Sequence, residues 1–90
     1  MSNISKDEEI IICSKAINNF GAAIQQVVAM EEMAELTQAI SKSIRGKEHN
    51  VEEEIADVEI MLTQLKIMFD MKKVEEYRDA KLRRLKGVVY

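Results

Sequence analysis

The sequence predicts an all-α protein, a four-helix bundle-like protomer that oligomerises through helix packing. Three observations lead to this prediction. The 90 residues include no proline and only three glycines, so few positions interrupt a helix. Ala, Glu, Lys, Ile, Met and Leu dominate, and most of these residues lose little conformational freedom in a helix. No segment alternates polar and apolar residues between turn signals, as a strand would.

Local signals place the first two helices. Ser5, followed three residues later by a glutamate, forms a capping-box pattern that begins a helix over 5–20. Gly21 ends or bends that helix. The second helix is expected over 22–44, with Gly46 as the left-handed residue beyond its end.

The third helix is expected over 51–69, because Asn50 is a favourable N-cap and Glu53 occupies the third helical position. The fourth is expected over 72–86. Short links between long helices predict antiparallel neighbours, and hence a bundle.

Length and composition restrict the size and class of the protein. A chain of 90 residues fits one domain, residues 1–90. Such a chain buries only about 60–65% of its unfolded surface, yet 47% of its residues are hydrophobic. Part of this apolar surface is therefore expected to meet another copy of the chain.

Charge and cysteine content exclude several partners. The net charge of −3 argues against a nucleic-acid polymer. The apolar run that ends at Cys13 is too short to span a membrane. The single cysteine excludes an internal disulfide and favours a cytoplasmic location.

Two acids of the third helix fall where apolar residues are expected. Glu54 lies within the apolar stripe of this helix, and Asp57 lies at its edge. Glu52 and Glu59 face the opposite side, where acids are ordinarily solvated. The stripe comprises Val51, Ile55, Val58, Met61, Leu62, Leu65 and Phe69.

The second helix shows the same departure. A second stripe begins with Ile24 and Val28 and then becomes acidic at Glu31 and Glu35. Glu32 lies on the same flank. The first stripe is wholly apolar and comprises Ala29, Met33, Leu36, Ile40 and Ile44.

Converging carboxylates predict a bound divalent cation. Buried acids lose solvation and repel one another unless a cation compensates them. Glu32 with Glu35, and Glu54 with Asp57, are each spaced i,i+3, so each pair lies on one side of a helix. Antiparallel packing lets the two pairs face each other. Four oxygen ligands on a rigid frame suit Mg²⁺, with Mn²⁺ as a substitute.

Other interpretations of the acids stay open at this point. With 16 Asp and Glu residues in the chain, some fall on any stripe and are simply solvated. A structural metal site without turnover is another possibility, as is a catalytically silent helical oligomer that acts as a scaffold or as a regulatory nucleotide-binding protein. A di-iron bundle needs a Glu-x-x-His motif. The only histidine is His49. The residue three positions before it is Gly46 and not a glutamate, and His49 is expected in a loop.

Cations near the C-terminus are candidate phosphate ligands. Lys81 and Arg84 share the face of the predicted fourth helix that also carries Val74, Tyr77 and Leu85. The alternative interpretation is a basic last turn that complements the helix dipole. Arg45, in the link between the second and third helices, is a weaker candidate.

The acids also form a recognisable motif. Phe20-Gly21 and Gln25 precede Glu-Glu-Met-Ala-Glu-Leu at 31–36, and Glu-Glu-Ile-Ala-Asp-Val follows at 53–58. This pattern resembles the E-E-x-x-E … E-x-x-D signature of the MazG-like nucleotide pyrophosphohydrolases, in the all-α NTP pyrophosphatase superfamily. It is similar to the short, single-domain, phage-type members of that family. The resemblance covers the chain from about residue 20 to residue 84.

The resemblance implies an enzyme that uses Mg²⁺ to hydrolyse a nucleoside triphosphate to its monophosphate and pyrophosphate, with a role in nucleotide-pool clearance. It implies dimers, or dimers of dimers, whose active sites use helices from more than one chain. The implied catalytic residues are Glu31 and Glu32, where Glu31 is a ligand to a further ion or a base for water. The implied metal ligands are Glu32, Glu35, Glu54 and Asp57.

The contacts to the nucleobase are the least defined part of this expectation. Asn18, Phe20 and Gln25 precede the acidic motif and are the candidates. Phe20 is alternatively a core residue. Neither the base nor the sugar follows from the sequence.

Overall fold

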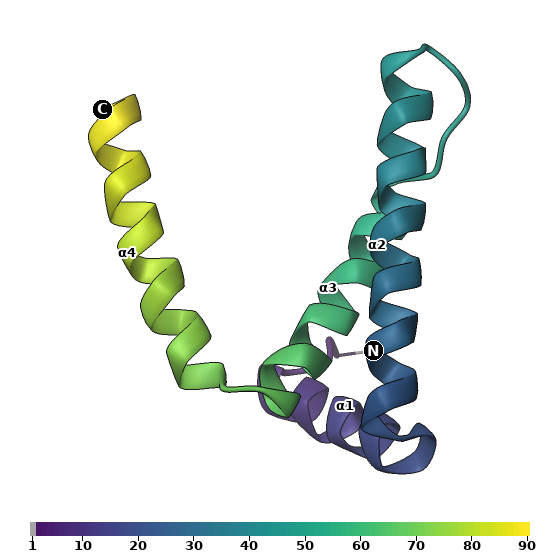
Figure 1. Ribbon diagram of the computed structural model, residues 1–90, viewed down its shortest axis with the longest axis vertical. Coiled ribbons are helices and arrows are strands. Elements are labelled where there is room, and N and C mark those ends of the chain that lie inside the picture. The colour runs from purple at the N-terminus through teal and green to yellow at the C-terminus, as the bar shows by residue number, and fades with distance from the viewer. Residues whose placement is uncertain (1) are drawn as a thin grey trace.

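The computed structural model describes residues 2–90, and within them it contains four helices and no strand. Figure 1 shows their arrangement. The all-α prediction is confirmed. The helices are α1 (Lys6–Phe20), α2 (Ala22–Ile44), α3 (Val51–Met68) and α4 (Met71–Val89).

The predicted ends of α1 and α2 are confirmed by their backbone geometry. Ser5 Oγ accepts the N–H of Glu8 at 3.1 Å, so it caps α1. Gly21, with φ 93°, separates α1 from α2 in a conformation that other residues rarely adopt. Gly46, with φ 72°, follows α2, where the Gly46 and Lys47 N–H groups donate to the carbonyls of residues 43 and 42. This pair of bonds is the Schellman motif expected after a helix.

The two later helices depart from the sequence prediction at their ends. The Asn50 side chain makes no capping bond to α3, so its predicted capping role is wrong. His49 Nδ1 instead accepts the N–H of Val51 at 3.3 Å. Asp70 Oδ1 caps α4 by accepting the N–H of Lys73 at 3.0 Å. Since Gly87 adopts helical geometry, α4 continues beyond the predicted 72–86.

The helices form a packed unit of three with a fourth standing apart. α2 and α3 pack antiparallel as a long hairpin, and α1 crosses the end of the hairpin that carries the α1–α2 corner (Figure 1). Among residues 2–90, α4 packs against no helix except α3. Its one ion pair with α3, Lys66 to Glu75 at 3.1 Å, is partly exposed and therefore stabilises little. The predicted bundle is thus not closed within one chain.

The core is small, and much apolar surface lies outside it. Along α2 the buried face runs through Gln25, Ala29 and Ala39, whereas Met33 and Ile40 of the predicted apolar stripe are exposed. Within residues 2–90, no helix is both long and apolar enough to cross a membrane. The buried apolar residues are Cys13, Ala29, Ala39, Val58 and Met61.

A buried amide pair joins α2 to α3. Gln25 Nε2 donates to Gln64 Oε1 at 2.8 Å, and the two residues are 7% and 4% exposed. We expect Gln64→Leu to lower the free energy of unfolding by about 1–3 kcal/mol, because it leaves the Gln25 donor buried without this acceptor. The double variant Gln25→Leu/Gln64→Leu should recover most of the loss. Urea unfolding at one fixed protein concentration measures both. Equal losses in the single and double variants would contradict this account.

Candidate metal site

Three carboxylates meet across the α2–α3 hairpin. Glu32 comes from the middle of α2, and Glu54 and Asp57 come from the first two turns of α3. One carboxylate oxygen from each lies within 4.8 Å of the others. The i,i+3 spacing of Glu54 and Asp57 and the antiparallel packing of the helices together produce this acidic cluster (Glu32, Glu54 and Asp57).

Burial makes the acidic cluster unusual. Glu54 is only 7% exposed, and Glu32 and Asp57 are half-buried. Glu32 Oε2 and Glu54 Oε2 are buried and have no hydrogen-bond partner within residues 2–90. Buried carboxylate oxygens normally receive donors, because leaving them without one is costly. A divalent cation between them would satisfy both oxygens, so the cluster could hold a metal ion.

The electrostatics of the acidic cluster agree with this interpretation. Burial raises the pKa of Glu32 above its ordinary value, and the neighbouring carboxylates of Glu35, Asp57 and Glu54 raise this pKa further. Both effects disfavour the charged form in the absence of a cation. Glu54 lies in the first turn of α3, at the positive end of the helix dipole, where a negative charge is favoured.

The two remaining acids of the motif lie beside the acidic cluster. Glu35 is exposed and is not one of the three residues whose oxygens converge, although its carboxylate contributes to the raised pKa of Glu32. Glu31 is also exposed. Both side chains are therefore free to meet a ligand or a bound water from the solvent side of α2.

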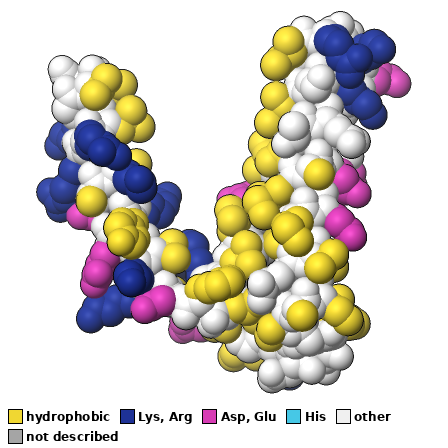
Figure 2. Space-filling model, in the orientation of Figure 1, with side chains coloured by type: hydrophobic (Ala, Val, Ile, Leu, Met, Phe, Trp, Pro, Cys, Tyr) yellow, Lys and Arg dark blue, Asp and Glu magenta, His cyan; other side chains and the backbone are white. Residues whose placement is uncertain are grey.

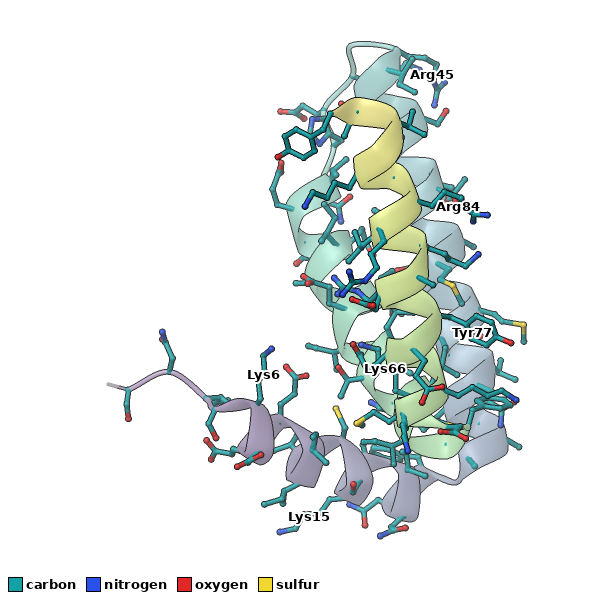
Figure 3. The ribbon with its side chains drawn as sticks, turned by 90° about the vertical axis from the view of Figure 1, so that its left-hand side faces the viewer. Lys6, Lys15, Arg45, Lys66, Tyr77 and Arg84 are labelled. Atoms are coloured by element: carbon teal, nitrogen blue, oxygen red, sulfur yellow. The ribbon has the colours of Figure 1, made fainter. Side chains whose placement is uncertain are left out.

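The candidate phosphate-binding cations are not brought to the acidic cluster within one chain. Lys81 and Arg84 lie with Tyr77 along a shallow hollow on α4, as the sequence predicted for a shared face. Figure 3 shows Tyr77 and Arg84 on this helix and Arg45 at the far tip of the hairpin. Arg45 Nε donates to the carbonyl of Ser41 at 3.3 Å and thus completes the end of α2.

The candidate base contacts lie at the opposite end of α2. Asn18 and Phe20 are exposed near the α1–α2 corner, so Phe20 is not a core residue. A rise of 1.5 Å per residue places this corner about 15 Å along α2 from Glu32. Gln25 is engaged by Gln64 in the helix seam.

Sequence reasoning missed Gln64 and assigned the Asn50 side chain to a cap. Gln64 follows Asp57 by seven residues and Met61 by three, so it lies on the seam that carries the acidic cluster. That spacing was the available signal. Nothing in the pattern indicated that Asn50 contacts carboxylates.

A larger hollow, of about 640 Å³, lies between α1, α3 and α4, away from the acidic cluster. Its charges are balanced, because Lys6, Lys66 and Arg78 line it together with three glutamates. Several of these groups already have partners, including Lys66 with Glu75. It therefore offers no net charge to a phosphate or a cation.

Comparisons with profiles of known families, with curated proteins and with solved structures find no match to this chain.

Proposed function

We propose that the protein is a Mg²⁺-dependent nucleoside triphosphate pyrophosphohydrolase that forms the nucleoside monophosphate and pyrophosphate. The observation that carries the proposal is that the carboxylates of Glu32 and Glu54 converge with that of Asp57, and that each of these two glutamates has a buried oxygen without a partner within residues 2–90. These residues belong to the E-E-x-x-E … E-x-x-D pattern that resembles the MazG-like enzymes.

The residues present suit this chemistry. Glu32, Glu54 and Asp57 would hold the ion on a rigid hairpin. Bound there, Mg²⁺ supplies charge neutralisation and a lowered pKa for the attacking water. The exposed carboxylates of Glu31 and Glu35 lie on the adjoining flank, where one can accept the proton of that water. Reaction at the α-phosphorus then releases pyrophosphate.

The active unit in this proposal is a homodimer or a dimer of dimers in which α4 packs against another copy. Charge favours this arrangement. α4 carries seven Lys and Arg residues and three Asp and Glu residues, a formal charge of +4. The whole chain has a net charge of −3, so the rest of it carries −7. The basic α4 of one chain and the acidic remainder of another chain therefore attract each other.

Apolar surface favours the same arrangement. On α4, Tyr77, Leu82 and Leu85 are 60%, 50% and 53% exposed. On α2, Ile24 and Met30 are each 60% exposed. Figure 2 shows hydrophobic side chains along the facing sides of α4 and the hairpin, with open space between them. A second copy would bury both surfaces, and it would carry the Lys81 and Arg84 of one chain toward the acidic cluster of another.

The direct test of the proposed reaction is pyrophosphate release from a panel of ribo- and deoxynucleoside triphosphates, with Mg²⁺, with Mn²⁺ and with chelator. We expect metal-dependent release with the monophosphate as co-product, because cleavage at the α-phosphorus yields these two products. Release of inorganic phosphate and a diphosphate would contradict this assignment.

A structural metal site is the second candidate, because the acidic cluster joins α2 to α3 and a bound ion would crosslink the hairpin. It predicts that Mg²⁺ raises the midpoint of thermal unfolding while the same panel shows no turnover. The two measurements on one preparation separate the candidates.

A further inference from the structure

Asn50 occupies the N-cap position of α3 without capping it. The position is usually taken by a residue whose side-chain oxygen accepts a helix N–H. Here the His49 ring accepts the N–H of Val51, and the backbone carbonyl of Asn50 accepts the N–H of Glu54 at 3.1 Å. The side-chain amide of Asn50 is therefore free for another use.

The amide is directed at carboxylates. Asn50 Nδ2 lies 2.8 Å from Glu54 Oε1 and 3.0 Å from Glu53 Oε1. Ionised carboxylates only accept hydrogen bonds, so the nitrogen of the Asn50 amide, and not its oxygen, must face them. One NH₂ group thus donates to two neighbouring carboxylates.

The two oxygens of Glu54 are consequently distinct. Oε1 receives the Asn50 amide, whereas Oε2 is buried, lacks a partner within residues 2–90 and belongs to the carboxylate that meets Glu32 and Asp57. A carboxylate held at one oxygen cannot rotate freely about its last side-chain bond. The Asn50 amide therefore fixes the orientation of Oε2, the buried oxygen of Glu54 that is left for a cation.

We infer that Asn50 is a positioning residue for a divalent cation, which anchors Glu54 Oε1 so that Oε2 is presented to the ion. The inference rests on the metal site of the proposed function. Groups that hydrogen-bond to metal ligands fix ligand orientation, and their loss typically lowers metal affinity by about 10–100-fold.

The test compares Asn50→Ala and Asn50→Asp with the wild-type chain in titrations with Mn²⁺ alone. Both variants remove the donor, so both should bind Mn²⁺ about 10–100-fold more weakly. A capping role predicts a difference between the two variants: Asp is as good an N-cap as Asn and suits the helix dipole, so Asn50→Asp should bind Mn²⁺ as the wild type does, whereas Asn50→Ala should not. Asn50→Asp binding Mn²⁺ as tightly as the wild type, or more tightly, overturns the inference.

Thermal unfolding in chelator provides a readout that a merely structural role would move. We expect Asn50→Ala to lose more in Mn²⁺ affinity than in unfolding temperature. Asn50→Asp should unfold below the wild-type temperature in chelator, because its carboxylate faces those of Glu53 and Glu54. Glu53→Gln is the matched control, because it alters the exposed partner of the same amide and should leave Mn²⁺ affinity within a few-fold of wild type. An Asn50→Ala chain whose loss of Mn²⁺ affinity is matched by its loss of stability in chelator would contradict positioning.

The titrations also separate this inference from the proposed function. Absence of Mn²⁺ binding by the wild-type chain overturns the metal site and the role of Asn50 together. Wild-type binding that both Asn50 variants retain overturns only the positioning role. Weakened binding in both variants supports the positioning role, even where the nucleotide panel shows no turnover.

Discussion

We expect Glu54→Gln to bind Mg²⁺ and Mn²⁺ at least about 100-fold more weakly than the wild-type chain. Loss of a residue that only supports a metal ligand lowers affinity by about 10–100-fold, and loss of a ligand should cost at least the upper end of that range. Metal-dependent pyrophosphate release should fall with it. The substitution preserves the shape of the side chain and keeps an oxygen to accept the Asn50 amide. It removes only the charge of the most buried member of the acidic cluster.

Stability should move in the other direction. In chelator, Glu54→Gln removes a buried carboxylate that has an unpartnered oxygen and faces two other acids, so the free energy of unfolding should stay equal or rise. Mn²⁺ titration calorimetry and urea unfolding with chelator measure the two effects on the same preparation. Reduced stability together with unchanged Mn²⁺ affinity would show that Glu54 is a structural residue and that any metal binds elsewhere.

Glu52→Gln is the matched control for this prediction. Glu52 lies on α3 two residues earlier, is exposed, and loses the same charge on substitution. We expect little change in metal affinity or pyrophosphate release. A large loss in this variant would mean that the wrong face of α3 has been assigned to the site.

The helix ends show what short-range signals can predict. The bounds of α2 agree with the prediction of 22–44, because Gly21 and Gly46 adopt positive φ values that end helices irrespective of what packs around them. The burial of Glu54 was also predicted from its spacing along α3, although Ile55 and Leu62 of the same predicted stripe are exposed.

The side of α2 that is buried and the position of α4 could not be predicted from the sequence in the same way. α2 carries apolar residues on more than one side, and periodicity cannot tell which side meets the same chain. The structure buries Ala29 and Ala39 and leaves Met33 and Ile40 exposed. The position of α4 depends on Phe69 and Asp70, where the backbone leaves helical geometry, and no pattern in the sequence specifies the resulting direction.

The side-chain hydrogen bonds around the acidic cluster could not be predicted from the sequence either. Asn is a favourable residue for an N-cap, and this preference was the only signal at Asn50. Which of two adjacent side chains caps α3 depends on the three-dimensional course of the loop that connects α2 to α3. That loop lets His49 reach the Val51 N–H and turns the Asn50 amide toward Glu54.

The second large effect concerns the proposed sharing of sites between chains. We expect Lys81→Ala/Arg84→Ala to be nearly inactive in pyrophosphate release, because no other cations of α4 share the hollow with Tyr77. Its Mn²⁺ affinity should match the wild type, since the acidic cluster is intact. Glu54→Gln should be inactive because it keeps these cations but lacks an intact acidic cluster. The two chains therefore lack complementary parts of the proposed site.

Mixing these two inactive chains tests where the cations come from. If α4 serves the acidic cluster of a second copy, each mixed dimer contains one site with an intact cluster and intact cations. Refolding the chains together in equal amounts makes half of the dimers mixed, so about a quarter of wild-type activity should return. If α4 serves its own chain, every site in the mixture lacks one of the two parts and no activity returns.

The controls follow from the symmetry of the assembly. Co-purification of an untagged Lys81→Ala/Arg84→Ala chain with an affinity-tagged Glu54→Gln chain after refolding establishes that exchange occurs. Arg83→Ala in place of the double variant should retain activity, because Arg83 pairs with Asp79 on the exposed side of α4. Recovery near a quarter requires both exchange and sharing of sites between chains. With exchange demonstrated, a mixture that remains inactive would place Lys81 and Arg84 on their own chain's cluster, and α4 would then have to fold back across the hairpin to reach it. The acidic cluster and the cations of α4 can act on one substrate only if the cations come from another chain or if α4 folds back within the same chain. The mixing experiment distinguishes these two arrangements by the presence or absence of turnover.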